Sequence, residues 1–254
     1  MNIKAGSCAL RTVHTIVILV ATLFSAATPA VVNVDITRAI INAGEKSVPL
    51  SLDNSGDQPM LVQVWVDEGN PGVSPDKVKT PVVILPPVFR MSPGEERSVK
   101  ILLANPTLLH PDREALYWLN IYQVPPLPVQ NEKASLQDDK ATSRVILPLR
   151  IRMKLFIRPE GVAPPSEKEG GKLIFARQMQ GTLAQLSVRN PTPWHMTLAT
   201  LSCGKTMVTG VLIAPGTRLI LPFKGHIPEC ATVNYEVIND DGNRLKHVAQ
   251  VQGR

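Results

Sequence analysis

The chain has 254 residues, of which 44% are hydrophobic and 19% are charged, and its net charge is +6. This balance argues against a disordered chain and is sufficient for one large or two ordinary packed domains. A basic protein suits acidic proteins, a membrane surface or nucleic acid as partners. Nucleic acid is disfavoured, because the Lys and Arg residues are scattered and lack interleaved aromatic residues. The 23 prolines are typical of an all-β protein with many turns.

Residues 1–30 have the features of a secretory signal peptide. Two basic residues precede an apolar centre at 15–24, which is too short to span a bilayer, and small residues follow it. We expect cleavage after Ala30, with Ala27 as the alternative. Removal takes away two basic and no acidic residues, so the mature charge is about +4. No later stretch is apolar enough for a membrane helix, so we expect an exported, soluble protein.

Three cysteines are present, and Cys8 leaves with the signal peptide. Cys203 and Cys230 remain, and an even pair in an oxidising compartment predicts a disulfide. In the chain-entropy model its loop of 27 residues stabilises the fold by about 3 kcal/mol or somewhat more. Two isolated cysteines without a spaced histidine pair make a poor zinc site, so we expect no metal.

From residue 31 onward, short strands alternate with turn signals. We expect strands at 31–41, 47–52, 60–66, 82–85, 97–103 and 115–124. Turn signals recur every 8 to 15 residues, which favours a β-sandwich.

A longer strand is expected at 143–157, after a polar run at 130–142 that reads as a loop. Its odd positions are all apolar: Val145, Leu147, Leu149, Ile151, Met153 and Leu155. The even positions include Arg150, Arg152 and Lys154, so the period is two, as in a strand with one apolar and one polar face. Pro148 argues against a helix. The stretch is either a core strand of the sandwich or an edge strand built to pair with another chain.

Proline, glycine and charge mark a linker at 159–165. Shorter strands follow at 173–177, 183–188, 195–201, 207–213, 217–223, 231–238 and 244–251. We therefore expect an all-β fold of two β-sandwich domains, 31–158 and 166–254, joined by this linker.

No local motif for catalysis is present. The sequence has no glycine-rich phosphate loop, no zinc-binding His-Glu pair and no nucleophile elbow. The mature histidines His110, His195, His226 and His247 are far apart in sequence. We therefore expect a protein that is not an enzyme.

Several sequence blocks, in order, resemble those of the PapD-like periplasmic chaperones of chaperone–usher pili. They are 37–40, 44–46, 63–67, 86–90, 93–94, 112–120, 124–126, 154–159, 190–193 and 238–242. Among them are Gln-Val-Trp-Val-Asp, Tyr-Trp-Leu-Asn and Lys-Leu-Phe-Ile-Arg-Pro. Each block is weak alone, but together they cover essentially the whole mature chain.

The resemblance implies two immunoglobulin-like domains set at an angle, with a cleft between them. It also implies a periplasmic protein that binds incomplete pilus subunits and delivers them to an outer-membrane usher. The chaperone lends one strand to a subunit that lacks its own last strand, and it needs neither ATP nor a cofactor.

By this resemblance Val145, Leu147 and Leu149 are donor side chains, with Ile151 a possible addition. The alternating pattern agrees, because alternate apolar side chains of a donated strand enter successive pockets. The alternative is that these residues fill the protein's own core.

The resemblance places Arg38 and Lys154 in the cleft, where they bind the C-terminal carboxylate of the subunit. It places Glu114, Arg158 and Asp240 in a charge network that holds the interdomain angle. The alternative for all five is an ordinary surface charge on a strand or turn.

Three features depart from the family's pattern. The stretch at 120–154 is longer than in short-loop members, yet the first domain lacks the cysteines of the long-loop branch. The branch and pilus type therefore stay open. Pro148 lies inside the expected donor strand, where it removes one ladder hydrogen bond. The Cys203–Cys230 bridge rests on compartment and number rather than on the family.

Two other classes of function stay open. One is a structural or adhesive component of the pilus itself, although a pilus subunit has one incomplete domain and this chain has two. The other is an exported carbohydrate-binding sandwich, for which the sequence shows no cluster of aromatic or acidic residues.

Overall fold

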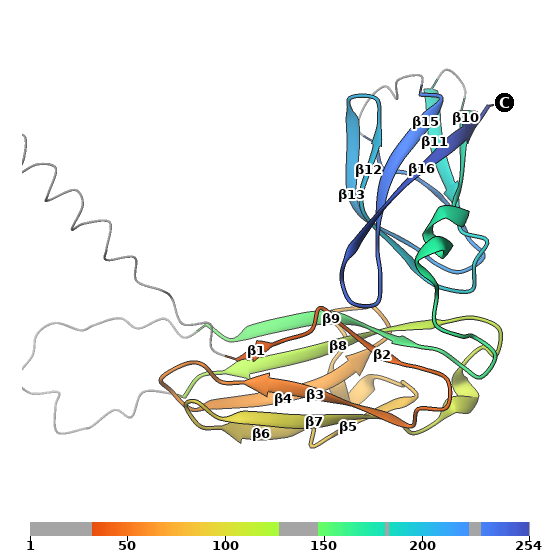
Figure 1. The fold of residues 1–254 in the computed structure, drawn as a ribbon. Coiled ribbons are helices and arrows are strands. Elements are labelled where there is room, and N and C mark those ends of the chain that lie inside the picture. Colours follow the sequence, from red (N-terminus) through yellow and green to blue (C-terminus); the bar gives the residue numbers. More distant parts are fainter. Residues whose placement is uncertain (1–31, 127–146, 181–182, 224–229, 254) are drawn as a thin grey trace, which may run out of the picture.

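The computed structural model describes residues 32–126, 147–180, 183–223 and 230–253. The expected signal peptide at 1–30 and the donor residue Val145 lie outside these ranges. The described chain forms two β domains, and the second stands at a steep angle on one end of the first (Figure 1). Within the described ranges, no helix has the length and apolar character needed to cross a membrane.

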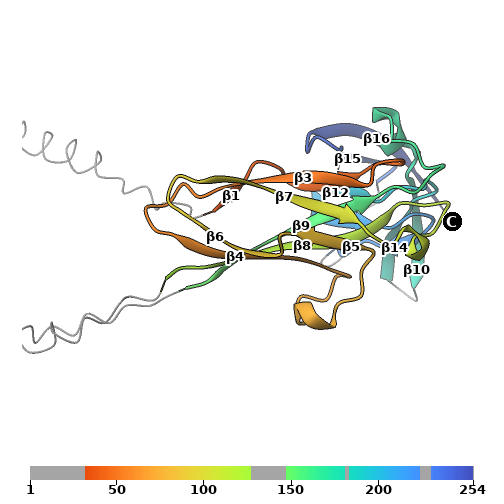
Figure 2. The ribbon, with the colours of Figure 1, turned by 90° about the horizontal axis from the view of Figure 1, so that it is seen from below.

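The first domain packs two sheets face to face (Figure 2). The four-stranded sheet has the order β1 (Asn33–Val34), β3 (Ser47–Asp53), β7 (Glu96–Leu103) and β5 (Val82–Leu85). The five-stranded sheet has the order β2 (Arg38–Ile41), β9 (Leu149–Ile157), β8 (Ala115–Val124), β4 (Met60–Asp67) and β6 (Val88–Met91). Alternate residues of both sheets form the core, and their fully buried members include Ile41, Leu50, Val62, Met91, Ile101, Leu119, Ile121, Leu155 and Ile157.

The expected single strand at 31–41 is wrong in one respect. It consists of two strands that belong to different sheets, β1 beside β3 and β2 beside β9. The exposed residues Asp35, Ile36 and Thr37 carry the chain from one sheet to the other. One period-two pattern thus covers two strands, because both alternate toward the same core.

Strand β9 confirms the alternation but starts later than expected, at Leu149. In the free protein Pro148 therefore precedes β9, although it still lies between the expected donor residues Leu147 and Leu149. A proline lacks the N–H that a ladder needs and is tolerated at the beginning of a strand.

The second domain is a sandwich whose two halves join along one side. Its strands have the order β13 (Thr206–Ile213), β12 (Met196–Cys203), β15 (Thr232–Ile238), β16 (Arg244–Gln252), β10 (Ile174–Gln180), β11 (Leu183–Arg189) and β14 (Arg218–Ile220). The halves meet at a short parallel pairing of β10 with β16. A second core, with Phe175, Leu198 and Val233 fully buried, lies between them.

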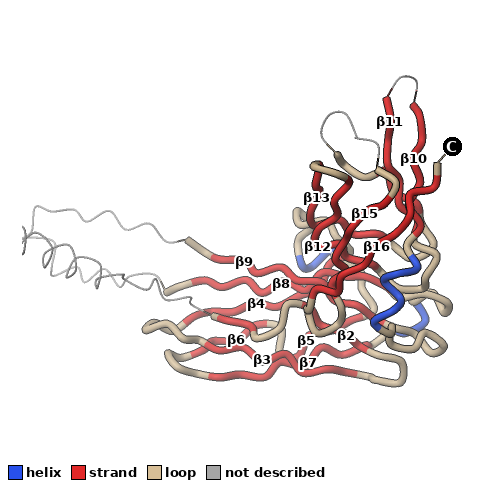
Figure 3. Tube along the Cα trace, turned by 45° about the horizontal axis from the view of Figure 1, so that its top comes forward, coloured by secondary structure: helices blue, strands red, loops and turns tan. Residues whose placement is uncertain are grey.

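The described residues also include three short 3-10 helices (Figure 3). They are η1 (Pro75–Lys77), η2 (Pro106–Leu108) and η3 (Glu167–Lys172), and the sequence pattern had not indicated them. The segment between the domains is packed rather than free. Val162 is 3% exposed, and the Ala163 carbonyl accepts a hydrogen bond from Trp194 Nε1 at 2.8 Å.

The structure contains the expected Cys203–Cys230 disulfide. Cys203 ends β12 and is fully buried, and Cys230 is partly buried against the same core. The bridge ties the end of β12 to the chain that enters β15.

The disulfide should be formed in the native protein and should stabilise the second domain. Replacing both cysteines by serine should lower the free energy of unfolding by about 3 kcal/mol, because the loop of the unfolded chain is no longer closed. Thiol titration of the denatured, unreduced mature protein should detect no free thiol. Two free thiols would contradict the pairing.

Candidate functional site

Arg38 and Lys154 lie side by side where the first domain meets the second. Strand β2 runs parallel to β9, and its first residue, Arg38, is in register with Lys154. Neighbouring strands are about 4.8 Å apart, and residues in register point to the same face of the sheet. The fold therefore holds two cationic side chains together at one point of the sheet edge.

The electrostatics of this pair favour an anion. No ion pair of Arg38 or Lys154 with a carboxylate is found among the described residues. Burial lowers the pKa of Arg38, although Asp240 and Glu114 act in the opposite direction. Burial and the charge of Arg38 lower the pKa of Lys154. A bound carboxylate would counteract the lowering of both pKa values, because its negative charge stabilises the charged forms of Arg38 and Lys154.

Their hydrogen bonds leave donors available. Lys154 Nζ donates to Thr197 Oγ1 of the second domain at 3.2 Å, and the other ammonium protons remain for a ligand. Within the described part of the chain, Arg38 Nε is buried without a hydrogen-bond partner. An unsatisfied charged donor is costly, so the site is better satisfied with an acceptor present.

The edge of β9 is open just before this pair. Strand β9 pairs with β8 along its whole length, but its pairing with β2 begins only at Lys154. The described residues place no strand on that side of Leu149–Met153. The backbone groups on this side are therefore free to pair with another strand.

The apolar face of β9 extends beyond the domain core. Met153 and Leu155 are buried, and Ile151 is partly buried against the core. Leu149 is 52% exposed and Leu147 is 71% exposed. The structure thus separates the alternate apolar residues into a buried end, which fills the protein's own core, and an exposed end, which does not.

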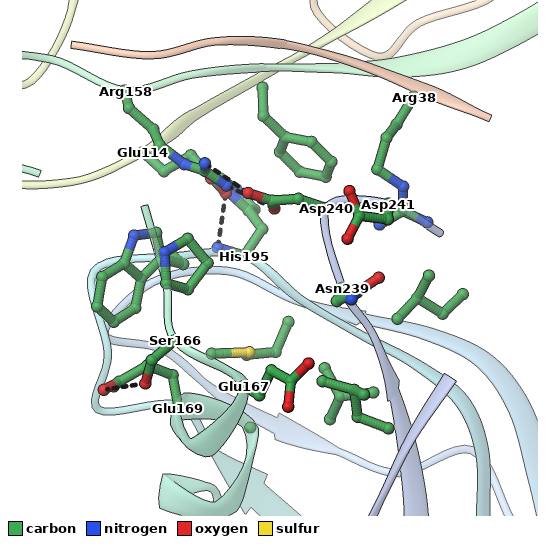
Figure 4. A pocket seen from close by; sticks show the side chains of 18 of the residues that line it. Arg38, Glu114, Arg158, Ser166, Glu167, Glu169, His195, Asn239, Asp240 and Asp241 are labelled. Atoms are coloured by element: carbon green, nitrogen blue, oxygen red, sulfur yellow. Dashed lines mark hydrogen bonds and ion pairs between the residues drawn. The ribbon is translucent and has the colours of Figure 1, made fainter. Parts of the chain in front are cut away.

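Arg158 joins the two domains through the predicted charge network (Figure 4). Its Nε donates to Glu114 at 2.9 Å, and two of its nitrogens bind both oxygens of Asp240 at 2.7 and 2.8 Å. Arg158 and Glu114 are each 3% exposed. Burial alone would lower the pKa of Arg158, but Asp240 and Glu114 outweigh it and raise the pKa.

Sequence reasoning missed several members of this network. The second oxygen of Glu114 accepts from the backbone N–H of His195 at 2.9 Å and lies 3.1 Å from its Nδ1. Asn42 accepts from Arg158 at 3.0 Å. The Glu114 N–H also donates to the Pro193 carbonyl at 2.9 Å. The only sequence signal was the turn before His195, because residues 190–193 match the family.

A cavity of about 290 Å³ lies between the domains beside the network. Its lining includes Arg38, Phe156, Arg158, His195, Met196 and Asp240. The tip of the β15–β16 hairpin closes one side, where a Cβ on Gly242 would lie 3.0 Å from Thr37 Oγ1. Glycine, at φ +87°, allows this close approach of the domains.

This arrangement can be compared with known proteins. Residues 31–163 match the family described as pili and flagellar-assembly chaperone, PapD N-terminal domain, and residues 168–249 match the PapD C-terminal domain of pili assembly chaperones. The chain belongs to the PapD family of pili assembly chaperones. The two matched regions correspond to the two β-sandwich domains of the structure.

Other PapD-family proteins are similar over most of their length. The chaperone protein FimB/FhaD of Bordetella pertussis is 32% identical over 222 residues, which covers 85% of this chain and 86% of that protein. The probable fimbrial chaperone YadV of Escherichia coli is 32% identical over 238 residues, which covers 90% of this chain and 93% of that protein. The matches span both domains and the linker.

Solved structures of the family show the same fold. The crystal structure of the YadV chaperone has a TM-score of 0.69 and 28% identity, and it covers 86% of this chain and 98% of that one. A Salmonella enterica complex of the SafA pilin with the SafB chaperone has a TM-score of 0.70 and 27% identity. The match covers 86% of this chain and 95% of that one. The expected fold class is therefore confirmed.

Arg158→Ala should destabilise the protein strongly, because Glu114 would stay buried without its cation. Removing one partner of a buried pair typically costs about 3–5 kcal/mol. Urea unfolding followed by circular dichroism measures this loss. Arg113→Ala is the control, because its pair with Asp112 is exposed and should contribute less than about 1 kcal/mol. Equal effects of the two variants would show that the network contributes no more than a surface pair.

Proposed function

We propose that this protein is a periplasmic chaperone that binds incomplete pilus subunits by donating strand β9. It then passes them to an outer-membrane usher. Family membership supports the class of function, and a neighbour of the same fold is a chaperone solved in complex with its pilin. The observation that carries the proposal is the open edge of β9, with Leu149 exposed on its apolar face and Leu147 exposed just before the strand.

The donor residues are the exposed continuation of the core face. Leu147, Leu149 and Ile151 share that face, and Val145 continues the pattern outside the described residues. Each aliphatic side chain that becomes fully buried in a partner's groove contributes about 1.5–3 kcal/mol. Main-chain hydrogen bonds along the free edge add the second part of the interaction.

Arg38 and Lys154 are proposed to anchor the subunit's C-terminal carboxylate. A strand that runs along β9 in the same direction must end where β2 begins, because β2 occupies the sheet edge from Lys154 onward. Its terminal carboxylate would then meet both cations, with a charge-assisted bond of about 1.5–3 kcal/mol to each. This fixes the register, and a slip by one residue would turn the donor side chains to the wrong face.

The proposal requires no chemical step. Strand pairing and ion pairing need neither ATP nor a cofactor, and no bond is broken. A periplasmic function requires that the protein is exported. The signal peptide expected at 1–30 would direct this export, with cleavage after Ala30 or Ala27. Glu114, Arg158 and Asp240 are proposed to maintain the angle that keeps the cleft open to the subunit.

Leu147→Glu should weaken subunit binding and leave the chaperone folded. Leu147 is 71% exposed in the free protein, so the charge costs little until the side chain must enter an apolar groove. Recovery of subunits in a periplasmic pull-down should fall at least about tenfold. Leu108→Glu is the control, because Leu108 is similarly exposed but lies in η2. Unchanged recovery with Leu147→Glu would argue against the donor assignment.

Arg38→Ala should abolish or greatly reduce subunit capture, because the carboxylate would lose one of its two cations. The measurement is a pull-down of the tagged protein from periplasm, with bound proteins identified by mass spectrometry. Lys100→Ala, an exposed charge on the other sheet, serves as the control. Equal capture by wild type and Arg38→Ala would refute the anchor, and capture of nothing by wild type would refute the chaperone function.

A further inference from the structure

The first half of β9, Leu149–Met153, is held to the domain on one side only. It pairs with β8, and its other edge has no strand beside it among the residues that the structure describes. Its apolar face also contributes little at the start, since Leu149 is 52% exposed. A strand with so few contacts needs another source of order to stay extended. We call Leu149–Met153 the donor half.

The polar face of the donor half supplies that order. Arg150 and Arg152 reach over β8 to the end of β4, where Asp67 lies. Arg152 Nη2 lies 2.6 Å from Asp67 Oδ1, and Arg150 Nη2 lies 3.5 Å from Asp67 Oδ2. One carboxylate thus binds both arginines of the donor half across the intervening strand β8.

Asp67 is itself fixed in position. It is 1% exposed and accepts the backbone N–H of Gly69 at 2.6 Å and Nδ2 of Asn120 at 2.8 Å. Burial alone would raise the pKa of Asp67, but the hydrogen bonds of Arg152, Asn120 and Gly69 outweigh it and lower the pKa. The fully buried Asn120 in turn accepts two bonds from Arg150 at 2.7 and 3.0 Å.

Aromatic rings complete the support. The Arg150 guanidinium lies 4.8 Å from the ring centroid of Trp65, and that of Arg152 lies 4.3 Å from Trp118. Such cation–π contacts restrict the arginine side chains further. Arg150 also donates to the Pro71 carbonyl at 2.7 Å, which connects the donor half to the β4–β5 loop.

We propose that Asp67 is a positioning residue for strand donation, which acts through Arg150 and Arg152 to hold the donor half straight against β8. This inference rests on the proposed function. The period of two puts the arginines on the face opposite to Leu149 and Ile151, so the support leaves the donor side chains and the open edge free. A strand ordered in advance loses less entropy on binding, which favours the complex.

The test is Asp67→Asn in the full mature protein, a change that keeps the side-chain shape and removes the charge. Hydrogen exchange followed by mass spectrometry should show about tenfold faster exchange in peptides covering the donor half, with peptides from β12 unchanged. The same periplasmic pull-down should recover about tenfold less of the exported β-protein that wild type captures most strongly.

Glu95→Gln is the matched control. Glu95 also pairs with an arginine, Arg97, whose guanidinium lies over the ring of Phe89. Glu95 precedes β7, and Arg97 lies in β7 of the four-stranded sheet, so this ion pair makes no contact with the donor half. Both measurements should be unchanged. Arg152→Gln tests whether Asp67 acts through Arg152. If it does, the double variant Asp67→Asn, Arg152→Gln should show no faster exchange and no lower recovery than the more severe single variant.

Three results would overturn the inference. One is unchanged exchange in the donor half of Asp67→Asn. Another is faster exchange to the same extent in all peptides, which would indicate a general loss of stability. The third is equal capture by wild type and Asp67→Asn. Capture of nothing by wild type would instead refute the proposed function, and this inference with it.

Discussion

The geometry of the site depends on the crossover between β1 and β2. The chain leaves the four-stranded sheet after Val34 and enters the five-stranded sheet at Arg38, beside the second half of β9. Had the same segment stayed in one sheet beside β9, the edge of β9 would be paired and closed. The crossover instead leaves the first half of the strand open.

In the proposed function, the same crossover determines where an incoming strand ends. Strand β2 occupies the edge from Lys154 onward, and its first residue is the cationic Arg38. A free edge, a physical stop and two half-buried cations therefore occur at one point. In the proposed function, donation and register both follow from this one topological feature. The ion pairs of Arg158 with Glu114 and Asp240 join the two domains nearby.

Each face of β9 has a different role. The odd residues begin as exposed apolar side chains and end as core. The even residues are Arg150 and Arg152, bound to Asp67, then Lys154, which donates to the second domain, and the buried Phe156. Arg158 follows the strand and lies in the domain junction. Because alternate residues face opposite sides, one strand can present a binding edge, a support and an anchor without conflict.

The sequence alone determined the fold class, most of the strand positions and the alternation along β9, because these follow from local periodicity and turn signals. The expected strand at 244–251, for example, is β16 at Arg244–Gln252. The sequence did not indicate β6 (Val88–Met91), a short strand next to two prolines.

Tertiary structure decided which strands are neighbours, since pairing depends on contacts between residues far apart in sequence. It therefore decided that 31–41 divides between two sheets and that Arg38 lies beside Lys154, which the sequence suggested only through a family resemblance. The contacts of Asp67 with Arg150 and Arg152 span more than 80 residues of chain, and no local pattern marks a buried carboxylate that binds partners at such a separation.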